Sequence, residues 1–125
     1  MPMTTYMANK LANAAVANVA YTSTTVYMSL FSAAPTVAGG GTEITGNGYS
    51  RQLTTFATPS NGVITNTGNV TFSCTGNNWP TVVSTGVHDA STGGNLLFFT
   101  SVAARNVKVS DTLIYGTGNV SVKIA

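Results

Sequence analysis

The chain has 125 residues, of which 43% are hydrophobic and only 6% are charged, and its formal net charge is +2. An ordinary soluble domain carries roughly 25% charged residues, whereas disordered chains combine few apolar residues with high net charge, so this composition excludes intrinsic disorder. The length favours a single domain over 1–125, with an N-terminal helix and arm over 1–19 and a β-sandwich over 20–125.

The first predicted element is a short amphipathic helix from residue 6 to about residue 19. Thr4 or Thr5 can act as its N-cap, and apolar residues recur at helical spacing from Met7 onward, without Gly or Pro. The apolar stripe is narrow and rich in alanine, so we expect it to dock on a sheet or on a neighbouring subunit. Lys10 is its only cation, which disfavours a membrane-surface helix.

After residue 20 the hydrophobic pattern changes to period two, which predicts short strands separated by turns rich in Gly and Asn. We expect seven or eight strands, at 26–31, 49–56, 69–74, 82–88, 96–100, 107–109, 113–115 and 120–124, with 33–48 as a loop. No helical stretch separates the later strands, so parallel βαβ units are excluded. The predicted fold is mainly β, a β-sandwich or jelly-roll-like domain with one N-terminal α-helix.

The single cysteine, Cys74, excludes an intramolecular disulfide and a CxxC site, and we expect it to be buried beside Val70 and Phe72. The five basic residues are scattered, so the sequence predicts no nucleic-acid binding. No apolar stretch reaches the roughly 18 residues of a membrane span, and the N-terminus lacks the pattern of a signal peptide. We therefore expect no membrane partner and synthesis in a cytoplasm.

The sequence offers little material for catalysis. His88 and Asp89 are the only adjacent imidazole and carboxylate, and neighbours on a strand point to opposite faces. One His, one Cys and three carboxylates do not form a recognisable triad, glycosidase pair or zinc site. We interpret 39–41 as a flexible glycine loop and 89–94 as a hairpin turn. The sequence thus predicts a non-enzymatic protein without metal or cofactor.

Five residues are candidate contacts to a partner or to another subunit: Tyr49, Arg51, Trp79, Arg105 and Lys108. Arg51 stands on a nearly uncharged strand and needs an acceptor, either Glu43 in the same chain or a group on a neighbouring subunit. Trp79 is either an interface hot spot or part of the core. Arg105 and Lys108 are the only basic residues close together in this part of the chain.

Two sets of segments resemble the signatures of a known family. The first set is AYT at 20–22, TVYMSLF at 25–31, GTE at 41–43 and GNGYSRQ at 46–52; the second is GVHDA at 86–90 and TGGNLLFF at 92–99. Together they resemble a family of small structural proteins of the tailed-bacteriophage virion. His88 departs from the pattern, since an aromatic or apolar residue is usual there.

Members of that family are head decoration, cement or tail-associated proteins, so the resemblance implies a virion protein made in the host bacterial cytoplasm. We expect a capsid decoration or cement protein, a homotrimer over capsomer junctions with the major capsid protein as partner. A tail or fibre-adaptor component bound to a tail protein is the first alternative. A carbohydrate-binding module for host recognition, with Trp79, Tyr49 and Tyr115 as its platform, is the second.

Overall fold

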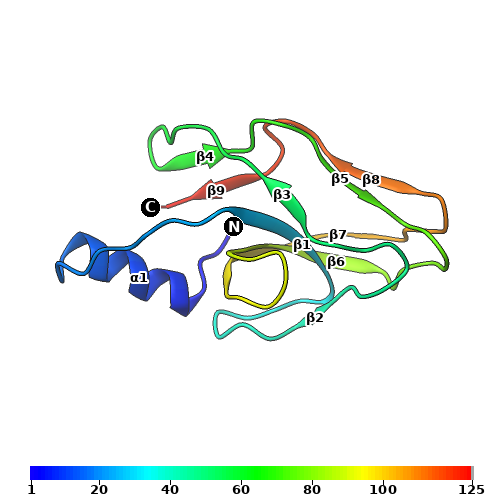
Figure 1. Cartoon of the computed structure of the whole chain (residues 1–125), viewed down its shortest axis with the longest axis horizontal. Coiled ribbons are helices and arrows are strands. Elements are labelled where there is room, and N and C mark those ends of the chain that lie inside the picture. Colours follow the sequence, from blue (N-terminus) through cyan, green and yellow to red (C-terminus); the bar gives the residue numbers. More distant parts are fainter. Residues whose placement is uncertain (125) are drawn as a thin grey trace.

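The computed structural model describes residues 1–124 and has the predicted mainly β fold, with antiparallel sheets and one N-terminal helix (Figure 1). Within this range the elements are α1 (Thr5–Ala15), β1 (Val26–Ala33), β2 (Thr42–Glu43), β3 (Gln52–Thr54), β4 (Val63–Thr65), β5 (Val70–Ser73), β6 (Val82–His88), β7 (Leu96–Arg105), β8 (Thr112–Tyr115) and β9 (Ser121–Lys123).

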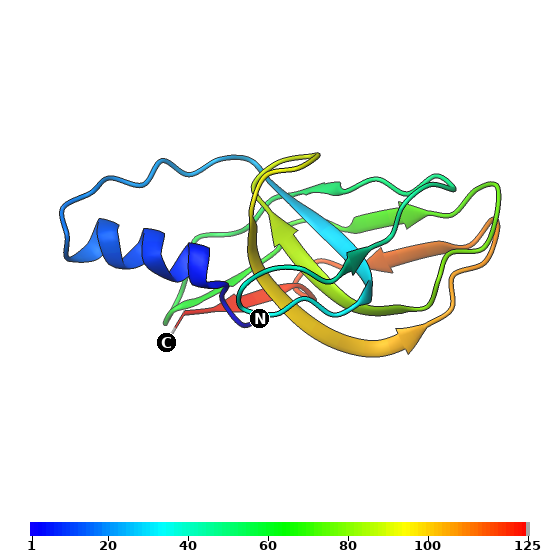
Figure 2. The same cartoon turned by 90° about the horizontal axis from the view of Figure 1, so that it is seen from below.

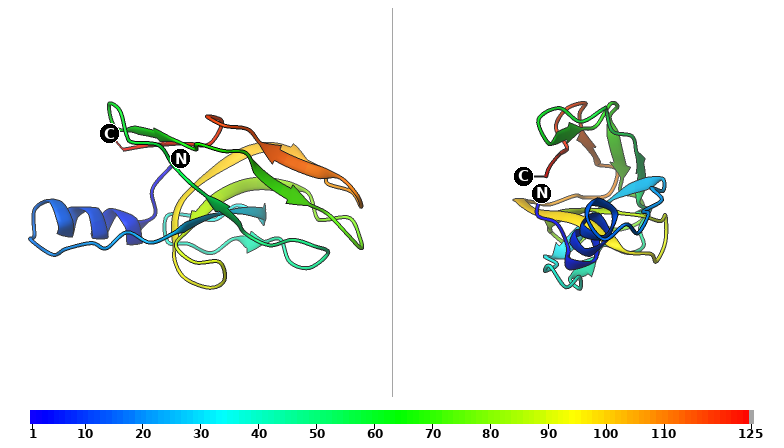
Figure 3. Two further views of the ribbon diagram at one scale, coloured as in Figure 1. Left: turned by 45° about the horizontal axis from the view of Figure 1, so that its top comes forward. Right: turned by 90° about the vertical axis from the view of Figure 1, so that its left-hand side faces the viewer.

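The strands form two facing layers, as in a sandwich (Figure 3). The first layer is a five-stranded sheet in the order β2-β1-β6-β7, and β3 pairs with β1 along the same edge as β2. The second layer consists of the antiparallel pairs β4–β9 and β5–β8, which follow one another as a two-stranded ribbon. The sandwich core therefore lies between one complete sheet and one narrow ribbon.

The ribbon changes register by one residue between its two halves, and Asn66 occupies the break. Its side chain is buried, its amide donates to the carbonyls of Gly68 and Gly116, and its carbonyl accepts the Val120 N–H. An irregular ladder leaves backbone groups without strand partners, and a buried polar group without a partner is costly. Asn66 supplies those partners, so the two halves of the ribbon remain joined.

The main core fills the space between the layers. Its buried side chains come from both sheets and from the connecting loops: Met28, Leu30, Ile44, Val70, Phe72, Cys74, Trp79, Val82, Val107, Leu113 and Val120. Cys74 is buried on the same side as Val70 and Phe72, as predicted from their alternation. The Cys74 thiol contacts the Asn77 carbonyl at 3.1 Å, within the chain.

Several predicted strand limits were wrong. Residues 107–109 form no strand, because Asp111 closes a turn there: its carboxylate accepts the Lys108 N–H and its own N–H donates to the Lys108 carbonyl. The strand expected at 49–56 is confined to β3. The expected loop at 33–48 contains β2, and β4 was not predicted at all. Both β2 and β4 are too short to show a clear alternation.

Helix α1 begins as predicted at its N-cap Thr4, whose hydroxyl accepts the Met7 N–H and donates to the Leu96 carbonyl at 2.7 Å. It ends four residues earlier than expected, at Ala15, because Asn18 has a left-handed φ of 58° and the chain reverses. Figure 2 shows α1 and the returning segment projecting together beyond the sandwich. No helix among residues 1–124 has the length and hydropathy needed to cross a membrane.

Candidate functional site

Arg51 is bound inside its own chain. Its side chain is 9% exposed and forms a two-pronged ion pair with Glu43, with Nε and Nη2 each 2.9 Å from a carboxylate oxygen. Its remaining nitrogen donates to the carbonyls of Ala90 and Gly93 in the turn between β6 and β7. Of the two partners considered for Arg51, the structure therefore has the internal one, and the guanidinium joins β2 to the turn between β6 and β7.

Tyr49 completes this arrangement. Its hydroxyl donates to Glu43 at 2.6 Å and accepts the N–H of Leu30, in the stretch of β1 between the residues paired with β2 and those paired with β3. Burial raises the pKa of the Tyr49 phenol, and the bond to Glu43 adds to that rise. Burial acts to raise the pKa of Glu43, but the bonds from Arg51 and Tyr49 bring it below its ordinary value. Both side chains thus serve the fold.

Trp79 is 5% exposed, and its indole N–H donates to the Asn47 carbonyl at 2.9 Å. Its ring meets Tyr49 edge to face at 5.6 Å, while Tyr49 and Tyr115 both pack on the central Phe72. The three aromatic residues expected to form a sugar-binding platform are therefore turned toward the core. Trp79 and Tyr49 offer little surface to a partner in this fold.

Arg105 and Lys108 are exposed, one at the end of β7 and the other in the turn that follows. The end of β7 and the turn after it lie at the end of the sandwich opposite α1 (Figure 1). Neither basic residue forms an ion pair within the described residues. Of the five candidate contacts, these two basic residues alone are fully available to a partner.

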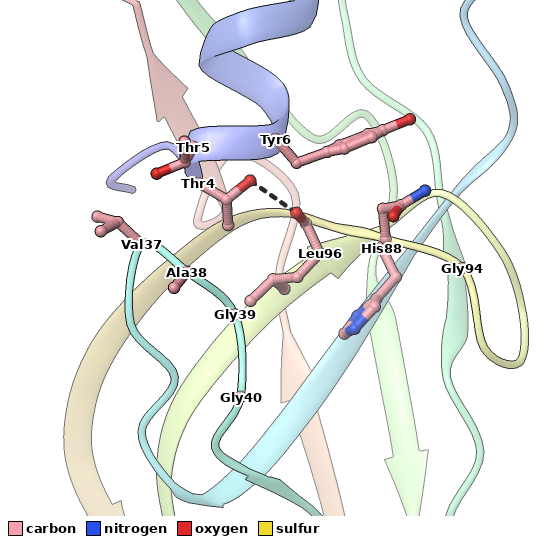
Figure 4. Close-up of a pocket in the computed structure, with 11 residues that line it drawn as sticks. Thr4, Thr5, Tyr6, Val37, Ala38, Gly39, Gly40, His88, Gly94 and Leu96 are labelled. Carbon is pink, nitrogen blue, oxygen red and sulfur yellow. Dashed lines mark hydrogen bonds between the residues drawn. The ribbon is translucent and has the colours of Figure 1, made fainter.

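A polar cavity of about 310 Å³ lies where the start of α1 meets two loops (Figure 4). Its walls come from Thr4, Thr5, Tyr6, Val37, Ala38, Gly39, Gly40, His88, Gly94, Asn95 and Leu96. His88 is its only titratable imidazole, and that ring shares a 2.8 Å hydrogen bond with the buried Ser29 hydroxyl and stacks on Phe31. Burial and the nearby Arg51 charge lower the pKa of His88 to about 4, so the ring is neutral at pH 7.

The carboxylates also hold local structure. Asp89 accepts the N–H and the side-chain amide of Asn95 and so closes the turn between β6 and β7, and Asp111 closes the turn after Lys108. Among residues 1–124, no three His, Cys, Asp or Glu side chains are grouped so as to hold a metal ion. With Glu43 bound to Arg51, each acid is engaged in a bond that fixes a loop.

An apolar groove of about 320 Å³ opens at the end of the sandwich from which α1 projects. Its lining residues come from α1, the segment after it and both layers: Met7, Tyr21, Ser23, Thr24, Val26, Phe56, Ile64, Val87, Leu97, Phe98, Val122 and Ile124. No pattern in the sequence indicated this groove. The alternation of Val122 and Ile124 indicated a buried strand face, but which end of a sandwich stays open depends on how distant segments are placed.

The tip segment, residues 12–20, covers the end of α1 and the turn after it, and every one of its residues is exposed. Its valines are prominent, with Val16 86% and Val19 53% exposed. The chain carries no charge between residues 11 and 42. The expected apolar stripe of the helix is therefore divided: Met7 and Leu11 pack against the sandwich, while Ala14 and Ala15 lie in the exposed tip segment.

Comparison with known proteins places the chain in a family. The model of a family described as podophage GP4 fiber I protein gp80 matches residues 2–123. A search of curated proteins finds no match. Because the match covers nearly the whole chain, the chain belongs to this family of tailed-phage virion structural proteins, as its sequence signatures indicated.

Proposed function

We propose that this member of the phage fibre family is a non-enzymatic structural component of the tail, built into or next to the fibre apparatus. The observation that carries the proposal is the family match over residues 2–123, whose description names a fibre protein. It favours the tail or fibre alternative over the capsid decoration and cement role that we first expected. A tail protein accordingly replaces the major capsid protein as the proposed partner.

The internal bonding of the polar side chains supports a structural role. His88 and the three carboxylates, the groups from which an active site would be assembled, each form hydrogen bonds that hold a loop or the core. The hydroxyl that pairs with the His88 imidazole belongs to Ser29, which has no exposed surface, so a substrate cannot reach that hydroxyl. In this chain the same groups stabilise the scaffold, and the apolar tip segment and groove remain as surfaces for assembly.

The proposal is tested by co-sedimentation of the purified chain with phage tails that lack it, beside heads that lack it. We expect saturable binding to tails and none to heads. Saturable binding to heads alone would contradict the tail assignment and restore the cement role with the major capsid protein as partner. Binding to neither, but to host-cell envelopes, would move the chain to host recognition.

A homotrimer and synthesis in the host cytoplasm remain predictions of the sequence. Sedimentation equilibrium of the purified chain measures the first. The count of copies per tail, obtained from the saturation of binding, gives the symmetry at which the chain is used. A copy number divisible by three would agree with trimers.

A further inference from the structure

The tip segment and the apolar groove are complementary surfaces that one molecule does not bring together. The groove is lined by aliphatic and aromatic side chains, and the tip segment exposes Val16 and Val19 among alanines. Soluble chains rarely leave contiguous apolar surface open unless something covers it. Both surfaces are apolar, so each could cover the other.

The geometry of α1 prevents the chain from filling its own groove with its own tip. The start of the helix is fixed to β7, because Thr4 donates from its backbone to Leu97 and from its hydroxyl to Leu96. From there the helix axis leads away from the sandwich (Figure 2). At the far end the Val19 N–H donates to the Asn13 carbonyl. This hydrogen bond closes the turn that directs the chain back toward β1. The tip is thus held at a distance from the groove beside its base.

We propose that the groove receives the tip segment of a second copy of this chain. The inference rests on the proposed function only in taking the chain to act within an assembly. Val16 and Val19 of one copy would enter between Phe56, Ile64 and Ile124 of the other, removing apolar surface of both from water. No charge has to be buried on the tip side, because residues 11–42 carry none.

The positions of the two surfaces determine the kind of assembly. Met7 near the start of α1 and Tyr21 in the returning segment both line the groove. The groove therefore opens where α1 leaves the sandwich, and the tip segment lies at the far end of the same projection. Copies that meet at this end can each place a tip in a neighbour's groove, which gives a dimer when the exchange is reciprocal and a ring when the rotation between successive copies closes. A ring of three would be the homotrimer expected from the sequence.

Sedimentation velocity of the purified full chain over a range of concentrations tests this inference. The tip variant, Val16→Lys with Val19→Lys, puts two charges into the apolar contact and should weaken self-association at least about 100-fold. The matched control, Leu53→Lys with Ile114→Lys, adds the same charge at two aliphatic residues that are 58% and 55% exposed elsewhere. It should associate as the unmodified chain does.

A mixing experiment identifies the two halves of the contact. Ile124→Glu changes a half-exposed residue of the groove and leaves the tip intact, whereas the tip variant keeps an intact groove. Each variant alone should sediment as a monomer, and a mixture of the two should regain association, because one intact tip meets one intact groove. Circular dichroism checks that each variant keeps its fold.

An unmodified chain that stays monomeric at every concentration, or a tip variant that associates as strongly as the control, would overturn the inference. The first result would exclude a second copy as the occupant of the groove. The tail co-sedimentation experiment is independent of these results. A monomeric chain that still binds tails would refute the second copy as occupant and leave the proposed function standing.

Discussion

Around Arg51, the guanidinium makes bonds to Glu43, Ala90 and Gly93 and joins β2 to the turn between β6 and β7. In the tip segment, by contrast, residues 12–20 are all exposed and Val16 is 86% open to solvent. Both regions belong to a chain with few charges. The Arg51–Glu43 charge pair is thus used inside the fold, while the uncharged projecting surface is free for other molecules.

The largest expected effect comes from removing the Arg51 guanidinium. Arg51→Ala leaves the carboxylate of Glu43 partly buried without its partner, and removing one member of a buried ion pair costs about 3 kcal/mol. We expect a drop of that size in the free energy of unfolding, measured by urea denaturation. Arg105→Ala, the same change at an exposed arginine, is the control and should alter stability by less than about 0.5 kcal/mol. Equal effects of the two changes would contradict an internal role for Arg51.

The second prediction concerns the buried amide that joins the halves of the ribbon. Asn66→Ala removes the partners of Gly68, Gly116 and Val120 and should cost about 2 kcal/mol. Asn77→Ala is the matched control, because Asn77 is exposed and its side chain makes no hydrogen bond within the described residues. Denaturation of both variants in urea measures the difference, and a loss of stability confined to Asn77→Ala would refute the role of Asn66.

The third prediction concerns the contribution of the buried His88 ring to stability, which depends on pH. Its folded pKa of about 4 lies below the ordinary 6.5, so the unfolded chain binds a proton that the folded chain does not. The contribution of the neutral His88 ring to the free energy of unfolding is therefore fully present above pH 6.5 and falls as the pH drops toward 4, by roughly 3 kcal/mol. Below pH 4 the contribution of His88 no longer changes. The lowered pKa of Glu43 acts in the same direction as that carboxylate becomes protonated.

His88→Phe should flatten the decline between pH 6.5 and 4, because the ring that stacks on Phe31 can no longer take a proton. Its stability at pH 7 should be somewhat lower, since the buried Ser29 hydroxyl loses its partner. Chemical denaturation at pH 7, 6, 5 and 4 measures both effects. A variant with the same pH profile as the original chain would show that His88 does not titrate as inferred.

Local patterns predicted much of the fold. Thr4 was one of two candidate caps and is the N-cap, and the alternation through Val70, Phe72 and Cys74 identified a buried face. These features depend on residues within a few positions of one another. β2 and β4 were not predicted because two or three residues carry no periodicity, and because their pairing partners lie elsewhere in the chain, in β1 for β2 and in β9 for β4.

The functional surfaces were less accessible to sequence reasoning. Glu43 was weighed as the partner of Arg51 because it is near in sequence, but the carbonyls of Ala90 and Gly93 could not be found that way. The helix was expected to dock somewhere, yet nothing in its sequence showed that docking would stop after Leu11 and leave Val16 exposed. That division depends on the direction in which Thr4 and β7 fix the helix.

The smallest expected effect on stability belongs to the tip variant, Val16→Lys with Val19→Lys. Both side chains are more than half exposed and belong to neither core cluster, so the free energy of unfolding should change by less than about 0.5 kcal/mol. Val16 caps the C-terminal end of α1, where a cation is favoured by the helix dipole, so helicity should be kept. Urea denaturation beside Arg51→Ala makes the comparison direct. A tip variant as unstable as Arg51→Ala would mean that the fold itself depends on the tip segment. A tip variant that keeps its free energy of unfolding but loses self-association would show that the tip segment is a surface for assembly.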